Sequence, residues 1–182
     1  MSPRFWAQGL LHFWFHQLSA QARFASDPAV DAVIVRRFLP LLAPMAARPI
    51  ESLARDRDTL RAAILLFDQV PRNAFRNSAF AFAHDARALA LTRIALRRGW
   101  DKRLDRDARQ FLLMPLMHSE RRADQRESMA RFTALGSSYI RSFAADHARM
   151  VLRFGRFPHR NAVLGRRSSA AERRAVAAGN HW

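Results

Sequence analysis

The sequence predicts an all-α protein in which neighbouring helices pack as antiparallel hairpins. Apolar residues recur at helical spacing along most of the chain, and the alternation of β-branched residues that strands require is absent. Residues that start and stop helices recur at short intervals, and the segments between the expected helices are short. Short connections favour antiparallel neighbours.

The length and composition predict one domain. The chain has 182 residues, of which 49% are hydrophobic, so it can form a sizeable core. We find no low-complexity linker that would divide it. The expected domain therefore spans residues 1–182.

Three helices are expected in the first part of the chain, over residues 3–20, 28–39 and 56–70. Asp27 and Pro28 form a helix-start pattern, with an acid at the N-cap and proline at the first helical position. Proline lacks an N–H group and displaces the preceding residue from the α region. We therefore expect Pro40 and Pro44 to disturb the second helix and Pro71 to end the third.

Further helices are expected over residues 78–99, 105–114, 120–135 and 138–154. Gly99, Gly136 and Gly155 are typical helix stops, and Pro115 is expected to end the short helix before it. Ser169 and Glu172 have the spacing of a capping box, which predicts a last short helix.

The chain is strongly basic, with a formal net charge of +16. Such a charge favours polyanions such as nucleic acids or acidic membrane surfaces. All but one of the basic residues are arginine, the exception being Lys102, and this composition is also typical of a coding bias. Residues 121–182 carry 13 arginines against four acidic residues, so a polyanion is expected to bind there.

The composition also argues against several classes of protein. There is no cysteine, which excludes disulfide scaffolds, thiolate catalysis and zinc ribbons. No apolar run approaches the roughly 20 residues of a membrane helix, and the N-terminus does not resemble a signal peptide. We expect a cytoplasmic protein without a resident metal or cofactor.

Polar residues gather in three clusters, the first of them around the end of the third expected helix. Its candidate site residues are Asp68, Gln69, Arg72, Asn73 and Arg76. One interpretation is the polar wall of a binding site. The alternative is a helix cap, in which the arginines bind free carbonyl groups and pair with Asp68.

The second cluster contains His118, Ser119 and Glu120, with Gln125 a few residues later. A serine hydrolase is not favoured, because the glycines of a nucleophile elbow are missing and Ser119 occupies a natural N-cap position. His118 and Glu120 could share a metal ion or a proton with a distant partner. The alternative is a helix cap with a surface histidine.

The third cluster follows the helix that ends at Gly155, and Pro158 stiffens its turn. Its candidate site residues are Arg153, Arg156, His159, Arg160, Asn161 and Arg166. Arginine binds carboxylate or phosphate through two parallel hydrogen bonds, which favours an anion-recognition loop. The alternative is internal pairing of these arginines with acidic residues such as Asp68, Glu120 or Asp146.

Two histidines, His84 and His147, lie on apolar helix faces. Such residues are typically hydrogen-bonded members of the core. The alternative is that both point with His118 into a buried polar pocket.

Taken together, these clusters resemble a bacterial family known as domain of unknown function 924. The matching segments are 13–15, 67–76, 114–125 and 153–166, in order along nearly the whole chain. Phe67, Val70 and Leu53 depart from the family pattern, but all are apolar replacements. The resemblance implies an all-helical fold similar to the tetratricopeptide-repeat superfamily, and it implies no established activity.

The function favoured by the sequence is binding of a small anionic ligand, or of a protein or peptide, in a polar groove formed by the three clusters. A first alternative is a metal-assisted or acid–base hydrolase that uses Asp68, His118, Glu120 and His159. A second is nucleic-acid binding by the basic C-terminal third, which is less favoured because Phe154 and Phe157 are expected to be structural. The sequence assigns no catalytic residue.

Overall fold

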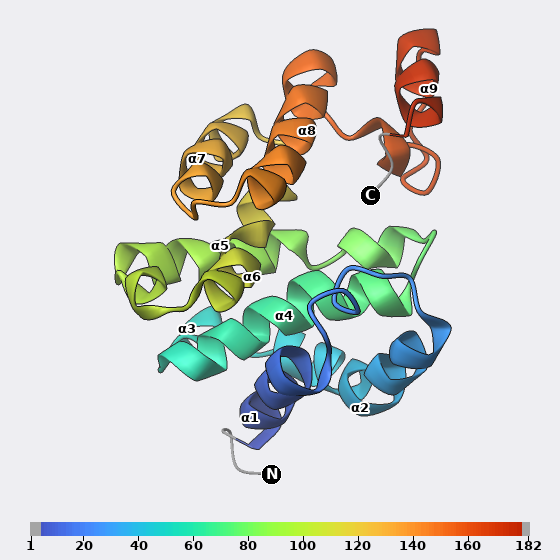
Figure 1. Cartoon of the computed structure of the whole chain (residues 1–182). Coiled ribbons are helices and arrows are strands. Elements are labelled where there is room, and N and C mark those ends of the chain that lie inside the picture. Colours follow the sequence, from blue (N-terminus) through green and yellow to red (C-terminus); the bar gives the residue numbers. More distant parts are fainter. Residues whose placement is uncertain (1–4, 180–182) are drawn as a thin grey trace. The chain divides into compact units, whose positions relative to one another are not determined.

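The computed structural model describes residues 5–179, and these form helices and connecting turns without any strand (Figure 1). The all-α fold class is thereby confirmed. The chain divides into two compact units. The first comprises the residues up to 76 together with residues 80–115, and the second comprises residues 77–79 and those from 116 onward. The predicted single domain and the tetratricopeptide-like stacking stay predictions.

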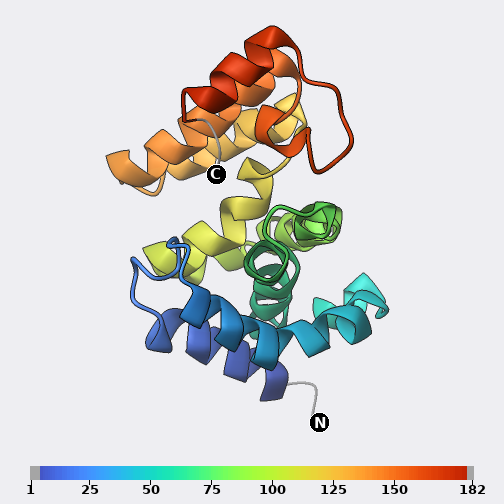
Figure 2. The same ribbon diagram turned by 90° about the vertical axis from the view of Figure 1, so that its right-hand side faces the viewer.

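The first unit is arranged around α4 (Arg57–Ala74), which packs against α1, α2 and α5 (Figures 1 and 2). Residues 62–71 of α4 are buried on every side, as the apolar run in the sequence predicts. The other elements of this unit are α1 (Phe5–His12), η1 (Phe13–Gln17), α2 (Pro28–Ala46), α3 (Ile50–Leu53), α5 (Asp85–Arg97), η3 (Trp100–Arg103) and most of α6 (Arg106–Met117). A short 3-10 helix, η2 (Ala79–Phe82), precedes α5.

The second unit contains the antiparallel hairpin of α7 (Arg122–Thr133) and α8 (Ser138–Phe154). The 3-10 helix η4 (Pro158–Arg160) and α9 (Ala170–Ala177) follow. Met150 and Val151 of α8, Phe157 before η4 and Ala175 of α9 form a small apolar core. This core holds the loop after α8 against the hairpin.

The expectations for the proline positions were wrong. Helix α2 continues through Pro40 and Pro44 to Ala46, α4 continues through Pro71, and α6 continues through Pro115. A proline removes only one hydrogen bond of a helix. Pro40 and Pro44 lie on the exposed face of α2, where water can reach the freed carbonyl groups, and the other two prolines lie in the last turn.

The first helix also differs from its prediction. The expected start at Pro3 lies outside the described residues, and α1 ends at His12 rather than near Ala20. A π-helix, η1, follows directly, and Leu18 N–H donates to the Phe13 carbonyl group at 3.1 Å. Single π-helical turns occur frequently at functional sites.

The helix caps agree better with the sequence. The Asp27 carboxylate caps α2, and Ser169 and Glu172 form the predicted capping box of α9. Gly155 ends α8 with a φ of 74°. Helix α7 begins at Arg122, two residues later than expected. Over residues 5–179, none of the helices is long and apolar enough to cross a membrane.

Candidate functional site

The first polar cluster ties α4 to the helices around it. The Arg72 guanidinium donates to both carboxylate oxygens of Asp85, at 2.9 and 3.0 Å, and to the Asp68 carbonyl group at 2.6 Å. Burial disfavours the charge of Arg72, but Asp68 and Asp85 outweigh this effect and raise its pKa. This arginine therefore stays charged and serves as a link between α4 and α5.

The remaining members of this cluster are bonded in the same way. Arg76 donates to both carboxylate oxygens of Asp31 in α2, at 2.8 and 2.9 Å. The Gln69 amide donates to the Asp68 carboxylate, and the Asn73 amide donates to the Gln69 carbonyl group. The geometry is that of the cap described above as the alternative, although the chief carboxylate partners are Asp85 and Asp31.

The second and third clusters meet inside the second unit. Glu120, just before α7, accepts two hydrogen bonds from Arg166, at 2.8 and 2.9 Å, and one from the Phe157 backbone N–H at 2.8 Å. Burial favours the protonated acid, but the hydrogen bonds from Arg166 and Phe157 lower the pKa of Glu120 overall. Its carboxylate is thus ionised and fully engaged, as the internal-pairing alternative describes.

Arg156 and Asn161 converge on a second carboxylate. Arg156 donates to both oxygens of Glu172 in α9, at 2.7 and 3.0 Å, and the Asn161 amide lies 3.3 Å from the same carboxylate. The hydrogen bond from Arg156 lowers the pKa of Glu172 to about 2. Two of the four arginines that the sequence suggested for anion recognition, Arg156 and Arg166, therefore bind carboxylates of the protein itself.

Aromatic and imidazole rings form a buried stack in the same unit. The His147 ring lies 6.0 Å from that of His118 and 5.5 Å from that of Phe157, and the Phe157 ring lies 5.6 Å from that of His159. The Arg160 guanidinium covers the Phe157 ring at 4.5 Å. His118, His147 and Arg160 are each less than 10% exposed.

His147 is a neutral base in this stack. Its Nδ1 donates to the Phe143 carbonyl group at 2.8 Å, so Nε2 carries the lone pair. Burial, and then the nearby His118, Arg160 and His159, lower the pKa of His147 to about 3. The predicted core histidine is thus hydrogen-bonded as expected.

Three further predicted residues are placed differently. Gln125 is buried and donates to the Met117 and Ser119 carbonyl groups, which fixes the turn before α7. Arg153 is exposed, with its guanidinium over the Phe154 ring. His84 belongs to the first unit, where its ring lies 5.6 Å from that of Phe67. Among residues 5–179 no group of three or more metal-ligating side chains is arranged to hold a metal ion.

A groove of the first unit lies beside the π-helix and has a volume of about 510 Å³. It is lined by residues of α1 and η1, of the turn after η1, and of the starts of α4 and α6. Its lining includes His12, Phe15, His16, Asp58, Arg61 and Asp105. The imidazole rings of His12 and His16 are stacked with their centres 5.4 Å apart, and both side chains are exposed.

Two arginines hold this groove together. Arg23 donates to the carbonyl groups of Trp14 and Phe15 at the end of the π-helix, at 2.9 and 3.2 Å, and to Asp107 of α6 at 3.0 Å. Arg61 of α4 pairs with Asp58 at 3.2 Å, and the guanidinium groups of Arg61 and Arg23 lie 5.4 and 5.5 Å from the Phe15 ring. Burial is the main reason for the lowered pKa of Arg61.

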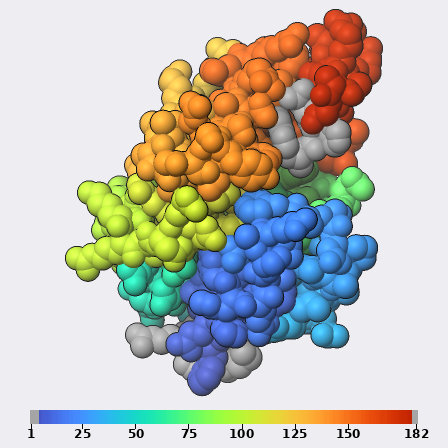
Figure 3. Space-filling model, in the orientation of Figure 1, coloured from blue at the N-terminus to red at the C-terminus, as the bar shows by residue number. Residues whose placement is uncertain are grey.

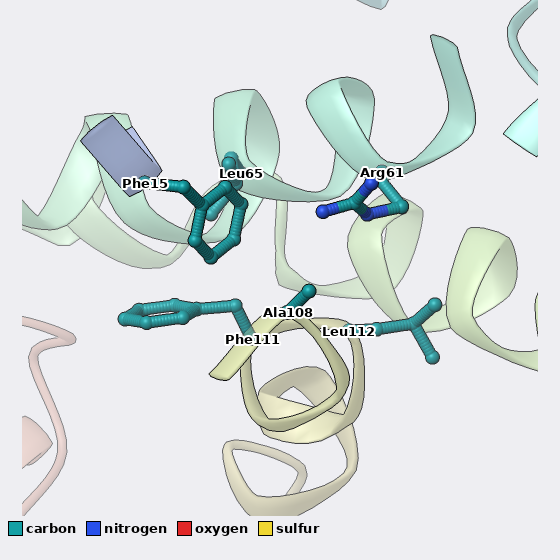
Figure 4. Close-up of a pocket in the computed structure, with 6 residues that line it drawn as sticks. All are labelled: Phe15, Arg61, Leu65, Ala108, Phe111 and Leu112. Carbon is teal, nitrogen blue, oxygen red and sulfur yellow. The ribbon is translucent and has the colours of Figure 1, made fainter. Parts of the chain in front are cut away.

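A small gap of about 10 Å³ lies under the groove and shares Phe15 and Arg61 with it. Figure 4 shows Phe15, Leu65 and Arg61 on one side of this gap and three side chains of α6 on the other. The rings of Phe15 and Phe111 meet edge to face at 5.8 Å. Apart from Arg61, the side chains that line this gap are apolar.

Comparison with known proteins decides the family. A family described as "Bacterial protein of unknown function (DUF924)" matches residues 10–180. This chain belongs to the DUF924 family. The solved structure of a protein of unknown function from Agrobacterium tumefaciens has 32% sequence identity and a TM-score of 0.89, over 95% of this chain and 97% of that chain. No curated protein matches the chain.

The family assignment confirms the resemblance drawn from the sequence. The groove of this DUF924 protein was not among the sites predicted from the sequence, because those predictions rest on the segments richest in arginine. The spacing of His12 and His16, four residues apart next to three aromatic residues, was the available signal. The acidic side chains that complete the groove come from α4 and α6, far along the chain.

Proposed function

We propose that the protein binds a small zwitterionic ligand, such as a free amino acid or a short peptide, in the groove beside the π-helix. The observation that carries this proposal is that carboxylate, guanidinium and imidazole groups line one groove of about 510 Å³ together with the Phe15 ring. Pockets for small molecules typically measure about 300–1,000 Å³.

The charges in the groove favour a ligand that carries both signs. Asp58 and Asp105 are exposed, and the charge of each favours the charged form of Arg61. The ammonium group of a ligand would bind these carboxylates. A ligand carboxylate would bind the imidazole edges of His12 and His16, whose N–H groups donate hydrogen bonds.

An apolar side chain of the ligand also has a place. Leu11 and Phe15 supply apolar surface in the groove, and the two guanidinium groups beside Phe15 keep its ring in position. The class of function, ligand or peptide binding, is the one the sequence favoured. The site differs, because Arg72, Arg76, Arg156 and Arg166 of the three clusters are engaged with carboxylates of the protein.

The test is a titration of the full chain with the dipeptide glycyl-phenylalanine, in which the thermal unfolding midpoint of the protein is measured at each concentration. Ligand at 100 times its dissociation constant adds about 2.7 kcal/mol to the free energy of unfolding. The N-acetylated and C-amidated dipeptides each lack one charge and should bind much more weakly. Asp58→Asn should abolish the shift, whereas Glu51→Gln, which removes an exposed carboxylate outside the groove, should retain it.

Equal shifts with the charged and the blocked dipeptides would contradict the proposal, as would equal shifts in Asp58→Asn and Glu51→Gln. The hydrolase alternative stays a prediction, and the engagement of Glu120 by Arg166 does not favour it. A cytoplasmic location is part of this proposal.

A further inference from the structure

Two aromatic side chains stand exposed near the start of α8. Tyr139 is 71% exposed and Phe143 is 37% exposed, and their rings meet edge to face at 5.0 Å. They are one helical turn apart on α8, which is orange in Figure 3. Their burial would normally be favourable, so an exposed pair indicates a surface that binds something flat and apolar.

Arginines cover the same hairpin. The buried residues of α7 are Asp124, Gln125, Ser128 and Phe132, which leaves Arg122 and Arg126 on the opposite side of the helix. Arg122 donates to the Leu152 carbonyl group at 3.3 Å, so the start of α7 lies beside the end of α8. This contact places the exposed Arg153 next to Arg122. We call Arg121, Arg122, Arg126, Arg149 and Arg153 the α7–α8 arginine face.

The acidic residues of this unit compensate that charge only at Arg149, which pairs with the partly exposed Asp146. All five are bonded internally: Glu120 to Arg166, Asp124 to Ser119, Glu127 to Arg131, Asp146 to Arg149 and Glu172 to Arg156. Within residues 5–179, no carboxylate forms an ion pair with Arg121, Arg126 or Arg153. A coding bias explains many arginines, but it does not explain why, of these five acids, Asp146 alone has more than a third of its side chain exposed.

We propose that the α7–α8 arginine face, together with Tyr139 and Phe143, binds single-stranded nucleic acid. Proteins that bind single strands combine a basic surface for the phosphates with aromatic side chains on which bases stack. In a duplex the bases are stacked on one another, so a duplex would contact only the arginines and not Tyr139 or Phe143. Single-stranded RNA and DNA share this chemistry, and an oligonucleotide of each kind distinguishes them.

The binding experiment measures fluorescence anisotropy of labelled 20-nucleotide oligo(U), oligo(dT) and a DNA duplex with the full chain at several salt concentrations. We expect the single strands to bind more tightly than the duplex. Tyr139→Ala with Phe143→Ala should weaken single-strand binding about 5- to 150-fold per stacked base, and leave duplex binding unchanged. Phe5→Ala, an equally exposed aromatic residue of the first unit, is the matched control.

A second pair of variants separates a specific face from overall charge. Arg121→Ala, Arg126→Ala and Arg153→Ala together should weaken binding and reduce the salt slope by about 2, since each lost phosphate contact on a single strand reduces it by about 0.7. Arg36→Ala, Arg55→Ala and Arg97→Ala remove the same charge from exposed positions of the first unit. This control should retain the slope.

Equal losses in the two triple variants would overturn the proposal, because binding would then follow net charge alone. Retained affinity in the aromatic variant would overturn it as well. A third result would also overturn the proposal: all variants bind equally to vesicles of phosphatidylglycerol, and none binds the oligonucleotides. Circular dichroism of each variant verifies that the exposed substitutions leave the helices intact.

Discussion

Arg166 binds Glu120 through both terminal nitrogens of its guanidinium group, at 2.8 and 2.9 Å, across 46 residues of sequence. The same carboxylate accepts the backbone N–H of Phe157. One acidic side chain before α7 thus fixes both ends of the loop that follows α8. This loop carries most of the third polar cluster, so its shape depends on the pair.

The pair should contribute to stability as a coupled unit. Hydrogen bonds to charged groups contribute about 1.5–3 kcal/mol, and partial exposure of both side chains reduces this to about 1–2 kcal/mol. We expect Glu120→Gln and Arg166→Met each to lower the free energy of unfolding by about that amount, and the double variant to lose little more. Urea unfolding of the parent, the two single variants and the double variant measures the coupling free energy between the two side chains. A coupling free energy near zero would show that the pair does not contribute to stability.

His147 should make the protein less stable as the pH falls. The unfolded chain protonates this imidazole near its ordinary pKa of 6.5, whereas the folded protein keeps it neutral until about pH 3. Between these values the unfolded state binds one more proton, so the free energy of unfolding falls by up to about 1.4 kcal/mol per pH unit. The steepest loss that is free of carboxylate titration lies between about pH 6 and 5.

The matching variant is His147→Asn, whose amide can still donate to the Phe143 carbonyl group. Its unfolding free energy should depend less steeply on pH over that interval, by up to about 1.4 kcal/mol per unit. Denaturant unfolding at pH 7, 6 and 5 provides the comparison. Parallel pH profiles of the two proteins would mean that His147 is protonated in the folded state.

The capping box of α9 should be worth about 1 kcal/mol. Ser169 Oγ accepts from the Glu172 N–H, and the Glu172 carboxylate accepts from the Ser169 N–H. Ser169→Ala removes one of these bonds and should destabilise α9 by about that amount. Hydrogen exchange should speed up within α9 first, and Ser26→Ala, at an exposed position, should leave it unchanged. Unaltered exchange in α9 would argue against the cap.

We expect that lysine cannot replace Arg23 beside the π-helix without a loss of stability. Its guanidinium group reaches three carbonyl groups and the Asp107 carboxylate at once, and an ammonium group cannot match this geometry. We expect Arg23→Lys to lower the free energy of unfolding by about 1–3 kcal/mol, because buried carbonyl groups lose their donors. Arg36→Lys, on the exposed side of α2, is the control and should change little. Equal stability of both variants would contradict this role.

The sequence by itself determined the helical class, the family and most helix starts. Caps are local, because Asp27 and Ser169 bond to backbone groups two or three residues away, and the sequence shows such spacings directly. The apolar run of α4 likewise predicted a helix buried on all sides. The helix ends at prolines were mispredicted, since packing of the surrounding residues outweighs the loss of a single hydrogen bond.

Only the tertiary structure decided which charged side chains are available to bind a ligand. The sequence alone is compatible with binding of Arg156 and Arg166 either to an anionic ligand or to a carboxylate of the protein. Which of the two occurs depends on Glu172 and Glu120, which lie 16 and 46 residues away. The π-helix and the groove beside it have the same origin, because Arg23, Asp58 and Asp107 meet there from distant segments. Long-range pairing of this kind follows from how helices pack, and no local pattern of residues encodes it.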